Sequence, residues 1–344
     1  MSSSSSVIPE YTPSYIDSLY DTELVNGNLF PKIGSSYDIN KPYFETFKDL
    51  RGFNQCISIF PSLDRKGSKL ILLYFHGNGC DLGDCTKRMR LLSIWLSCTV
   101  IGIEYAGYGH SIGEKSQESI IYKCVDSINY LREMKQIPYS RMVLYGHSIG
   151  CAIVMKLNSI FKSSFAGIIL MSPFINIKRV AEHHKLASSI MILEQVLSNL
   201  KEIKNMKETQ LLQIIHGKKD ETIPYTHSEI LYKECPVAPD NKFLHIQDYA
   251  THNVFDKELL HWHCLLPFFR LCEEKSFKPT FSLLKIMIKK TSKKTSTSIK
   301  KIRERQHDAW LSSDGKSCSF DLAMDENSNY KRGLSAIASF INQS

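Results

Sequence analysis

One pentapeptide of this chain has the residues of an activated nucleophile. The sequence GHSIG at residues 146–150 places Ser148 between two glycines, each two positions away. A serine on a sharp, strained turn between a strand and a helix needs neighbours without side chains, and Gly146 and Gly150 meet that need. The apolar run before the pentapeptide predicts the strand, and the pattern after it predicts the helix. We therefore predict that Ser148 is the nucleophile of an acyl-transfer reaction.

A nucleophilic serine needs a histidine as general base and a carboxylate that orients the histidine. After such a turn the partners follow in the order acid, then histidine, each in a loop beyond a later strand. The run LLQIIHGKKDETIP at residues 211–224 places Asp220 in such a loop, with Glu221 as the alternative. His252 lies in the loop after the last predicted strand, whereas His245 lies within that strand. We predict that Asp220 is the acid, His252 the base and His245 a structural residue.

Acyl transfer also needs two backbone N–H groups where the carbonyl oxygen becomes negative. The N–H of the residue after the nucleophile, Ile149, is the first expected donor. The second is expected in the loop after an early strand, which here reads His-Gly-Asn-Gly at residues 76–79. We predict Asn78 as this donor, with Gly79 as the alternative, and a structural role for His76.

The elements that must position these residues alternate along the chain. Short runs between residues 44 and 60 could form a hairpin. Continuous apolar runs, typical of strands buried on both faces, lie at residues 70–75, 98–104, 142–145, 166–171, 211–215 and 243–246. Helical patterns lie at residues 89–96, 116–136, 149–160, 225–235 and 254–271. This alternation predicts the α/β class, with a mostly parallel, doubly wound sheet and right-handed crossovers.

The 344 residues, 43% of them apolar, are enough for one large domain and an appendage. Residues 1–42, rich in Ser, Tyr and Pro, are expected to be irregular. Residues 43–274 form the predicted α/β domain, within which residues 174–208 are helical in pattern and predict a small lid. Residues 275–344 form a basic extension with a short final helix.

Eight apolar residues of the predicted lid could line a channel for an acyl chain, or could simply pack on the domain. They are Ile177, Val180, Leu186, Ile190, Leu193, Val196, Leu197 and Leu200.

The ten cysteines are scattered, without Cys-x-x-Cys spacing, and the chain begins with Met1 and five serines rather than an apolar signal segment. We therefore expect reduced thiols and a cytoplasmic protein. No apolar run is long enough for a membrane span.

His261, His263 and Cys264 are residue types that bind metal ions, but a spacing of two on a helix does not bring side chains together. We expect no metal and no cofactor.

The formal charge of +8 is concentrated near the C-terminus. The apolar segment 281–288 runs into eight basic residues between positions 289 and 305, a combination that favours weak contact with anionic membranes, on the cytosolic face. A solvated linker to the final helix is the alternative. Nucleic acid is not expected as a partner, because no aromatic residues alternate with the basic ones. The sequence leaves the oligomeric state open.

Seven blocks occur in one order at compatible spacings: HGNGCDLGDC, EYAGYGHSIGE, LYGHSIG, SPF, IIHGKKDETIP, YKECP and THNVFD. Over residues 45–272 the chain resembles the α/β-hydrolase domain-containing protein 17 group, within the serine aminopeptidase-like superfamily. The resemblance implies an α/β-hydrolase fold and a protein depalmitoylase, which cleaves palmitoyl thioesters of cysteines in membrane-associated proteins. The nucleophile, acid and base of the family correspond to Ser148, Asp220 and His252.

The chain departs from that family at two places. The family's turn usually carries glutamine where this chain has His147. Its animal members begin with a palmitoylated cysteine cluster, whereas the first cysteine here is Cys56.

The leading interpretation is a hydrolase of long-chain acyl thioesters or esters. An esterase or monoacylglycerol lipase is the alternative, a peptidase is less favoured, and a non-catalytic binding protein is disfavoured by the intact serine, acid and histidine.

Overall fold

The computed structural model describes residues 30–31, 34–64, 66–185 and 196–277. The predicted basic segment, the final helix and part of the predicted lid (Leu186, Ile190 and Leu193) lie outside these residues. The proposed division into domains therefore stays a prediction, although the described helices and strands run from Phe44 to Ser276.

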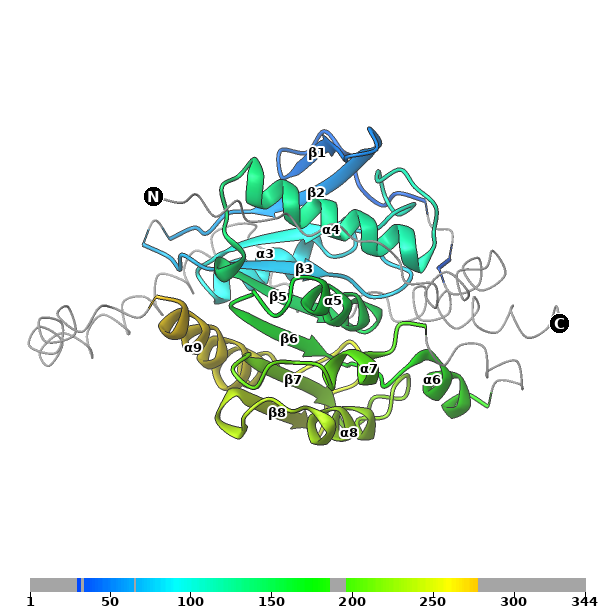
Figure 1. Ribbon diagram of the computed structural model, residues 1–344, viewed down its shortest axis with the longest axis vertical. Coiled ribbons are helices and arrows are strands. Elements are labelled where there is room, and N and C mark those ends of the chain that lie inside the picture. The colour runs from blue at the N-terminus through cyan, green and yellow to red at the C-terminus, as the bar shows by residue number, and fades with distance from the viewer. Residues whose placement is uncertain (1–29, 32–33, 65, 186–195, 278–344) are drawn as a thin grey trace, which may run out of the picture.

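A single eight-stranded sheet runs through the molecule (Figure 1). Its strands are β1 (Phe44–Lys48), β2 (Asn54–Phe60), β3 (Ile71–Phe75), β4 (Thr99–Ile103), β5 (Met142–His147), β6 (Gly167–Met171), β7 (Leu212–Gly217) and β8 (Lys242–Gln247). The spatial order is β1-β2-β4-β3-β5-β6-β7-β8. The first two strands pair antiparallel, as the predicted hairpin required, and the six strands from β3 to β8 are parallel. The predicted α/β class is confirmed.

The central strands are buried along their whole length, which explains why their sequences are continuously apolar rather than alternating. β5 extends two residues beyond the predicted run, so the strand itself carries the chain to His147. The next residue is the predicted nucleophile.

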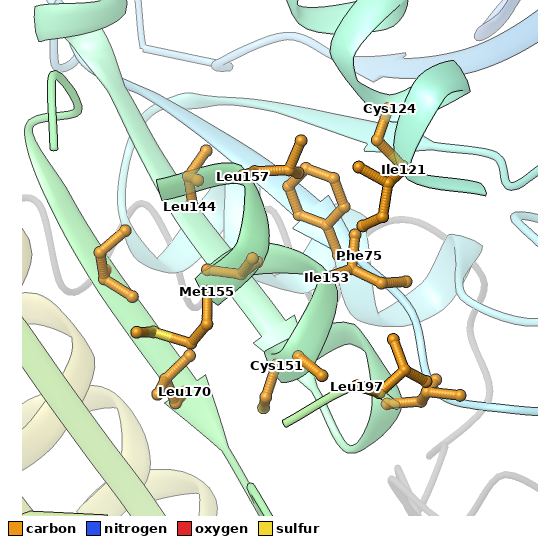
Figure 2. Packing of buried hydrophobic residues seen from close by; sticks show 14 of the residues in the cluster. Phe75, Ile121, Cys124, Leu144, Cys151, Ile153, Met155, Leu157, Leu170 and Leu197 are labelled. Carbon is orange, nitrogen blue, oxygen red and sulfur yellow. The ribbon is translucent and has the colours of Figure 1, made fainter. Parts of the chain in front are cut away.

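Helices cover both faces of the sheet (Figure 1). They are α3 (Thr86–Trp95), α4 (Gln117–Glu133), α5 (Ile149–Ile160), α6 (Ile177–His183), α7 (Asn199–Ile203), α8 (Thr226–Glu234) and α9 (Leu266–Ser276). Residues of α4 to α8 share one apolar core with the sheet, and residues of α3 and α9 form the core on the opposite face. Figure 2 shows the first of these cores, where Ile153 and Leu157 of α5 meet Phe75 and Leu144 of the sheet.

The prediction of a regular helix at residues 254–271 is wrong in two respects: the helix begins later, and its first turns are not α-helical. Asp256 accepts the backbone N–H of Leu259 through its carboxylate, so the helical turns begin after this residue. They open as a π-helix, η4 (Leu259–Leu265), before α9 continues. Pro267 lacks an N–H and cannot sit inside a regular α-helix, so the ladder is interrupted at this position.

The described part of the predicted lid packs on the domain. Four of its apolar residues belong to the main core and are at most 7% exposed: Ile177, Val180, Val196 and Leu197. These four residues therefore pack in the core and do not line a channel for an acyl chain.

Within the described ranges, no helix is long and apolar enough to cross a membrane. The nine cysteines located there are all buried and carry free thiols.

Candidate active site

Ser148 occupies a strained turn between β5 and α5. Its backbone has φ 54° and ψ −117°, a conformation that residues with a side chain rarely adopt. Two backbone hydrogen bonds hold the turn: the Ser148 N–H donates to the Met171 carbonyl at 2.9 Å, and the Cys151 N–H donates to the Ser148 carbonyl at 3.0 Å. The predicted strand, sharp turn and helix are present at this serine.

The two glycines of the turn are sterically required. A Cβ atom on Gly146 would lie 2.6 Å from the carbonyl oxygen of Gly150. A Cβ atom on Gly150 would lie 2.3 Å from the carbonyl oxygen of Phe75, at the end of β3. The first turn of α5 therefore packs directly on the backbone from which the loop 76–79 begins.

Asp220 and His252, 32 residues apart, are joined by a short hydrogen bond. Asp220 lies in the loop after β7, and its Oδ2 is 2.7 Å from Nδ1 of His252 in the loop after β8. Because a carboxylate only accepts, Nδ1 carries the hydrogen in this bond, which leaves Nε2 as the basic nitrogen of a neutral ring. A histidine and a carboxylate in this arrangement can act as a general base and its orienting acid.

The loop around Asp220 is built to keep this carboxylate ionised. Oδ1 accepts the backbone N–H groups of Thr222 and Ile223 at 2.9 and 2.8 Å, and Oδ2 also accepts Nε2–H of His216 at 3.0 Å. Burial opposes ionisation, but the charge of His252 and the hydrogen bonds of both histidines outweigh it and hold the Asp220 pKa well below its ordinary value. The Asp220 carboxylate is therefore ionised at neutral pH.

His216 was not singled out by the sequence analysis. It is the penultimate residue of β7, four residues before Asp220, and its Nδ1 contacts the Ser228 hydroxyl of α8 at 2.6 Å. The continuous apolar run of the strand directed attention away from this residue, although a polar side chain near the end of a buried strand is a usable signal.

The alternatives for acid and base lie elsewhere. Glu221 is exposed, and the carboxylate that contacts His252 belongs to its neighbour Asp220. His245 lies within β8, where burial lowers its pKa. Among the described residues, no group of three or more His, Cys, Asp or Glu side chains could hold a metal ion.

The loop 76–79 lies beside the start of α5, as an oxyanion site requires. Asn78 uses its Oδ1 to accept the Gly79 N–H at 3.1 Å and the Tyr108 hydroxyl at 3.3 Å, which fixes the shape of the loop. The Ile149 N–H belongs to the first turn of α5, where amides have no partner within the helix. The roles of Asn78 and Ile149 as oxyanion donors stay predictions.

A fully buried ion pair between His76 and Glu104 holds the start of this loop in place. Nε2 of His76 is 3.0 Å from Oε1 of Glu104, and its Nδ1 is 3.0 Å from the carbonyl of Gly77. Burial disfavours the charged imidazole, but the hydrogen bond and charge of Glu104 prevail and raise the His76 pKa to about 9. The structural role predicted for His76 agrees with these contacts.

A largely apolar cavity lies next to the His252 loop, between α3 and η4. Its lining residues are Arg88, Leu91, Leu92, Trp95, Tyr145, Met171, Asn253, Phe255 and Leu260. The guanidinium of Arg88 contacts the Asn253 carbonyl at 3.4 Å.

Comparisons with known proteins agree with this architecture. A family model described as serine aminopeptidase, S33, matches residues 69–207. The human alpha/beta hydrolase domain-containing protein 17C is 29% identical over 172 residues, which are 50% of this chain and 50% of that protein. An esterase from Pyrococcus furiosus superimposes with a TM-score of 0.52 at 15% identity, covering 73% of this chain and 99% of the esterase chain.

The protein has the α/β-hydrolase fold. Its similarity to the α/β-hydrolase domain-containing protein 17 group, within the serine aminopeptidase-like superfamily, is confirmed. The chain spans about half the length of the curated relatives it matches.

Proposed function

We propose that this α/β-hydrolase-fold protein cleaves acyl esters and thioesters with Ser148, His252 and Asp220 as its triad. The observation that carries the proposal is the 2.7 Å hydrogen bond from His252 to Asp220, in a protein whose serine occupies a strained turn. A structural histidine–aspartate pair would not require a serine held in that backbone conformation.

In the first half of the reaction, Ser148 Oγ attacks the acyl carbonyl while His252 Nε2 takes the hydroxyl proton. The tetrahedral oxyanion is stabilised by the N–H groups of Ile149 and Asn78 and by the N-terminus of α5. Asp220 stabilises the imidazolium that forms and remains ionised throughout. The intermediate then collapses and expels the thiolate or alkoxide, which takes the proton from His252.

In the second half, His252 removes a proton from water, and the resulting hydroxide oxygen attacks the acyl-Ser148 ester. Collapse of the second tetrahedral intermediate breaks the bond to Ser148 Oγ. His252 returns the proton to that oxygen, and the carboxylic acid leaves.

Palmitoyl thioesters on protein cysteines are the substrates we propose. The support is the resemblance to the α/β-hydrolase domain-containing protein 17 group and the chemistry of the leaving group, because a thiolate needs little acid assistance. Burial of a methylene group contributes ~0.8 kcal/mol, so a long acyl chain can supply considerable binding energy.

The test is a fluorophosphonate label followed by hydrolysis assays on the wild type and Ser148→Ala. We expect labelling of the wild type, no labelling of the folded variant, and a loss of hydrolysis by several orders of magnitude. A palmitoyl-cysteine peptide, a monoacylglycerol and a short-chain ester are compared as substrates. Preference for the monoacylglycerol would favour a lipase, and an unlabelled wild type would favour a non-catalytic binding protein.

We also propose that the basic segment at residues 289–305 brings the enzyme to anionic membranes. The support is the sequence alone: an apolar run followed by eight basic residues, each worth ~1 kcal/mol near an anionic surface. Co-sedimentation with anionic and neutral vesicles tests this contact. Equal binding to both vesicles, or unchanged binding after deletion of residues 281–305, would contradict it.

A further inference from the structure

The backbone carbonyl of His252 accepts two side-chain hydrogen bonds from the neighbouring strands. Nε2 of His147 donates to it at 3.2 Å, and the Ser172 hydroxyl donates at 3.3 Å. His147 is the last residue of β5, and Ser172 directly follows β6, its parallel neighbour in the sheet. Both side chains are buried, so these contacts belong to the interior of the site.

The partners of His147 define its protonation state. Because the His252 carbonyl can only accept, Nε2 of His147 carries a hydrogen, and in the neutral ring Nδ1 keeps a lone pair. Nδ1 is buried and has no hydrogen-bond partner among the described residues. It faces Gly77, where a Cβ atom would lie 3.0 Å away. A proton on Nδ1 would therefore have no acceptor.

The electrostatic surroundings agree with a neutral ring. Burial, and then the positive charge of Arg88, hold the pKa of His147 well below its ordinary value, and the charge that His252 acquires on taking a proton lowers it further. The ring therefore remains neutral while its covalent neighbour, Ser148, and its hydrogen-bond partner, His252, exchange a proton.

The hydrogen bond to Asp220 orients the His252 ring but does not fix the peptide that carries it. Within the loop, Thr251 N–H donates to the Val254 carbonyl at 2.9 Å, which closes a turn around His252. The hydrogen bond from His147 to the His252 carbonyl connects this turn to β5. It therefore joins the residue before the nucleophile directly to the backbone of the base.

We infer that His147 is a positioning residue, which together with Ser172 clamps the His252 carbonyl and sets the separation between base and nucleophile. The inference rests on the proposed function, because it assigns His147 a task within that triad. A misplacement of about 1 Å in a reacting group lowers the rate on the order of 100-fold. Loss of the clamp therefore lowers kcat and leaves KM nearly unchanged, because the His147 side chain is buried and its hydrogen bond goes to the backbone of the base.

The experiment compares His147→Gln with His147→Leu in the full chain, using a short-chain ester and the rate of fluorophosphonate labelling. The glutamine amide offers an N–H donor of similar reach, and leucine offers none. We expect kcat of His147→Gln to stay within about fivefold of the wild type, and kcat of His147→Leu to fall by about 10- to 100-fold. Ser172→Ala, which removes the second donor, is expected to fall between them.

His261→Leu is the matched control. His261 is also a buried histidine whose Nε2 contacts a backbone carbonyl, that of Trp95 at 3.0 Å, but it is bonded to neither Asp220 nor His252. This variant is expected to lose stability while the folded fraction labels at the wild-type rate. If His147→Leu does not fold, His147→Asn replaces it, since its amide is one carbon too short to reach the carbonyl.

Two failures are distinguishable. Equal kcat in the wild type and in a folded His147→Leu or His147→Asn variant overturns the clamp and leaves the proposed triad standing. A wild type that neither labels nor hydrolyses any ester overturns the proposed function, and the clamp with it. Equal losses in His147→Gln and His147→Leu would mean that ring packing, rather than the donated hydrogen bond, matters.

Discussion

Two of the histidine–carboxylate pairs near the strand ends, His76–Glu104 and His252–Asp220, differ in burial and in the contacts of their ring nitrogens. His76 and Glu104 are both fully buried, and both nitrogens of His76 face acceptors. His252 is 12% exposed at its side chain, and one of its nitrogens faces the carboxylate of Asp220. The first pair retains its proton and supports a loop. In the second pair, the contact with the carboxylate uses Nδ1 of His252, so Nε2 is the nitrogen that the proposed function assigns to proton transfer.

The comparison also shows how the carboxylates are stabilised. Glu104 accepts hydrogen bonds from the Tyr37 hydroxyl at 3.0 Å and from the N–H of Leu82 at 3.1 Å, so the N-terminal segment and the chain before α3 meet at this pair. Asp220 is held by two N–H groups of its own loop and by His216. Glu104 therefore joins distant segments, whereas the other hydrogen bonds of Asp220 come from its own loop and from the neighbouring end of β7.

The largest effect on activity is expected for Asp220→Asn. The amide can no longer hold His252 in the required tautomer, and kcat should fall on the order of 10⁴-fold while the fold is retained. The measurement is steady-state hydrolysis, with circular dichroism as the control for folding. A loss of less than tenfold would mean that Asp220 has only a structural role, like Glu104.

Glu104→Gln is expected to act on stability instead. Removing one charge of a buried pair leaves the other uncompensated and costs about 3–5 kcal/mol of unfolding free energy. Chemical denaturation measures this loss, and the folded fraction should still label with a fluorophosphonate. Unchanged stability with abolished labelling would reverse the roles assigned to the two pairs.

The pH dependence of stability should separate the pairs further. The folded pKa of His76, about 9, lies above its ordinary value, so its contribution is fully present below pH ~6.5 and is lost as pH rises toward 9. The pKa of Asp220 is depressed, so its contribution is lost only on acidification below pH ~4. The stability difference between the wild type and Glu104→Gln should therefore shrink from pH 6.5 to 9. A constant difference would contradict the charged state of His76.

The smallest effects are expected for Glu221→Gln and His245→Gln. Both residues lie near the triad in sequence, but the carboxylate of Asp220 is the group that contacts His252. Each variant should keep kcat/KM within about threefold of the wild type, since neither residue is given a role in the transition state. If Glu221→Gln were worse than Asp220→Asn, the assigned acid would be wrong.

Features that depend on residues close together in the chain could be predicted from the sequence. The strained turn at Ser148 follows from its two glycines, and the buried strands follow from apolar runs. The positions of Asp220 and His252 follow from loops that directly succeed those runs. The structure brings these two residues together at 2.7 Å, as the prediction required.

Features that depend on three-dimensional packing were beyond the sequence. The contact of His147 with the His252 carbonyl joins residues 105 positions apart, and nothing in either segment indicates it. The irregular helix near Pro267 is an intermediate case. Asp256 is a residue type that caps helix N-termini, but the apolar periodicity extending from residue 254 favoured an earlier helix start.

The backbone of Ser148 has a thermodynamic consequence for the whole chain. A residue with a side chain at φ 54° and ψ −117° stores about 1–3 kcal/mol of strain, which the surrounding fold must balance. Glycine adopts this conformation without that penalty. Under the proposed function, reactivity and backbone strain are linked at one position: Ser148→Gly would abolish the proposed hydrolysis and would also remove this strain from the folded chain.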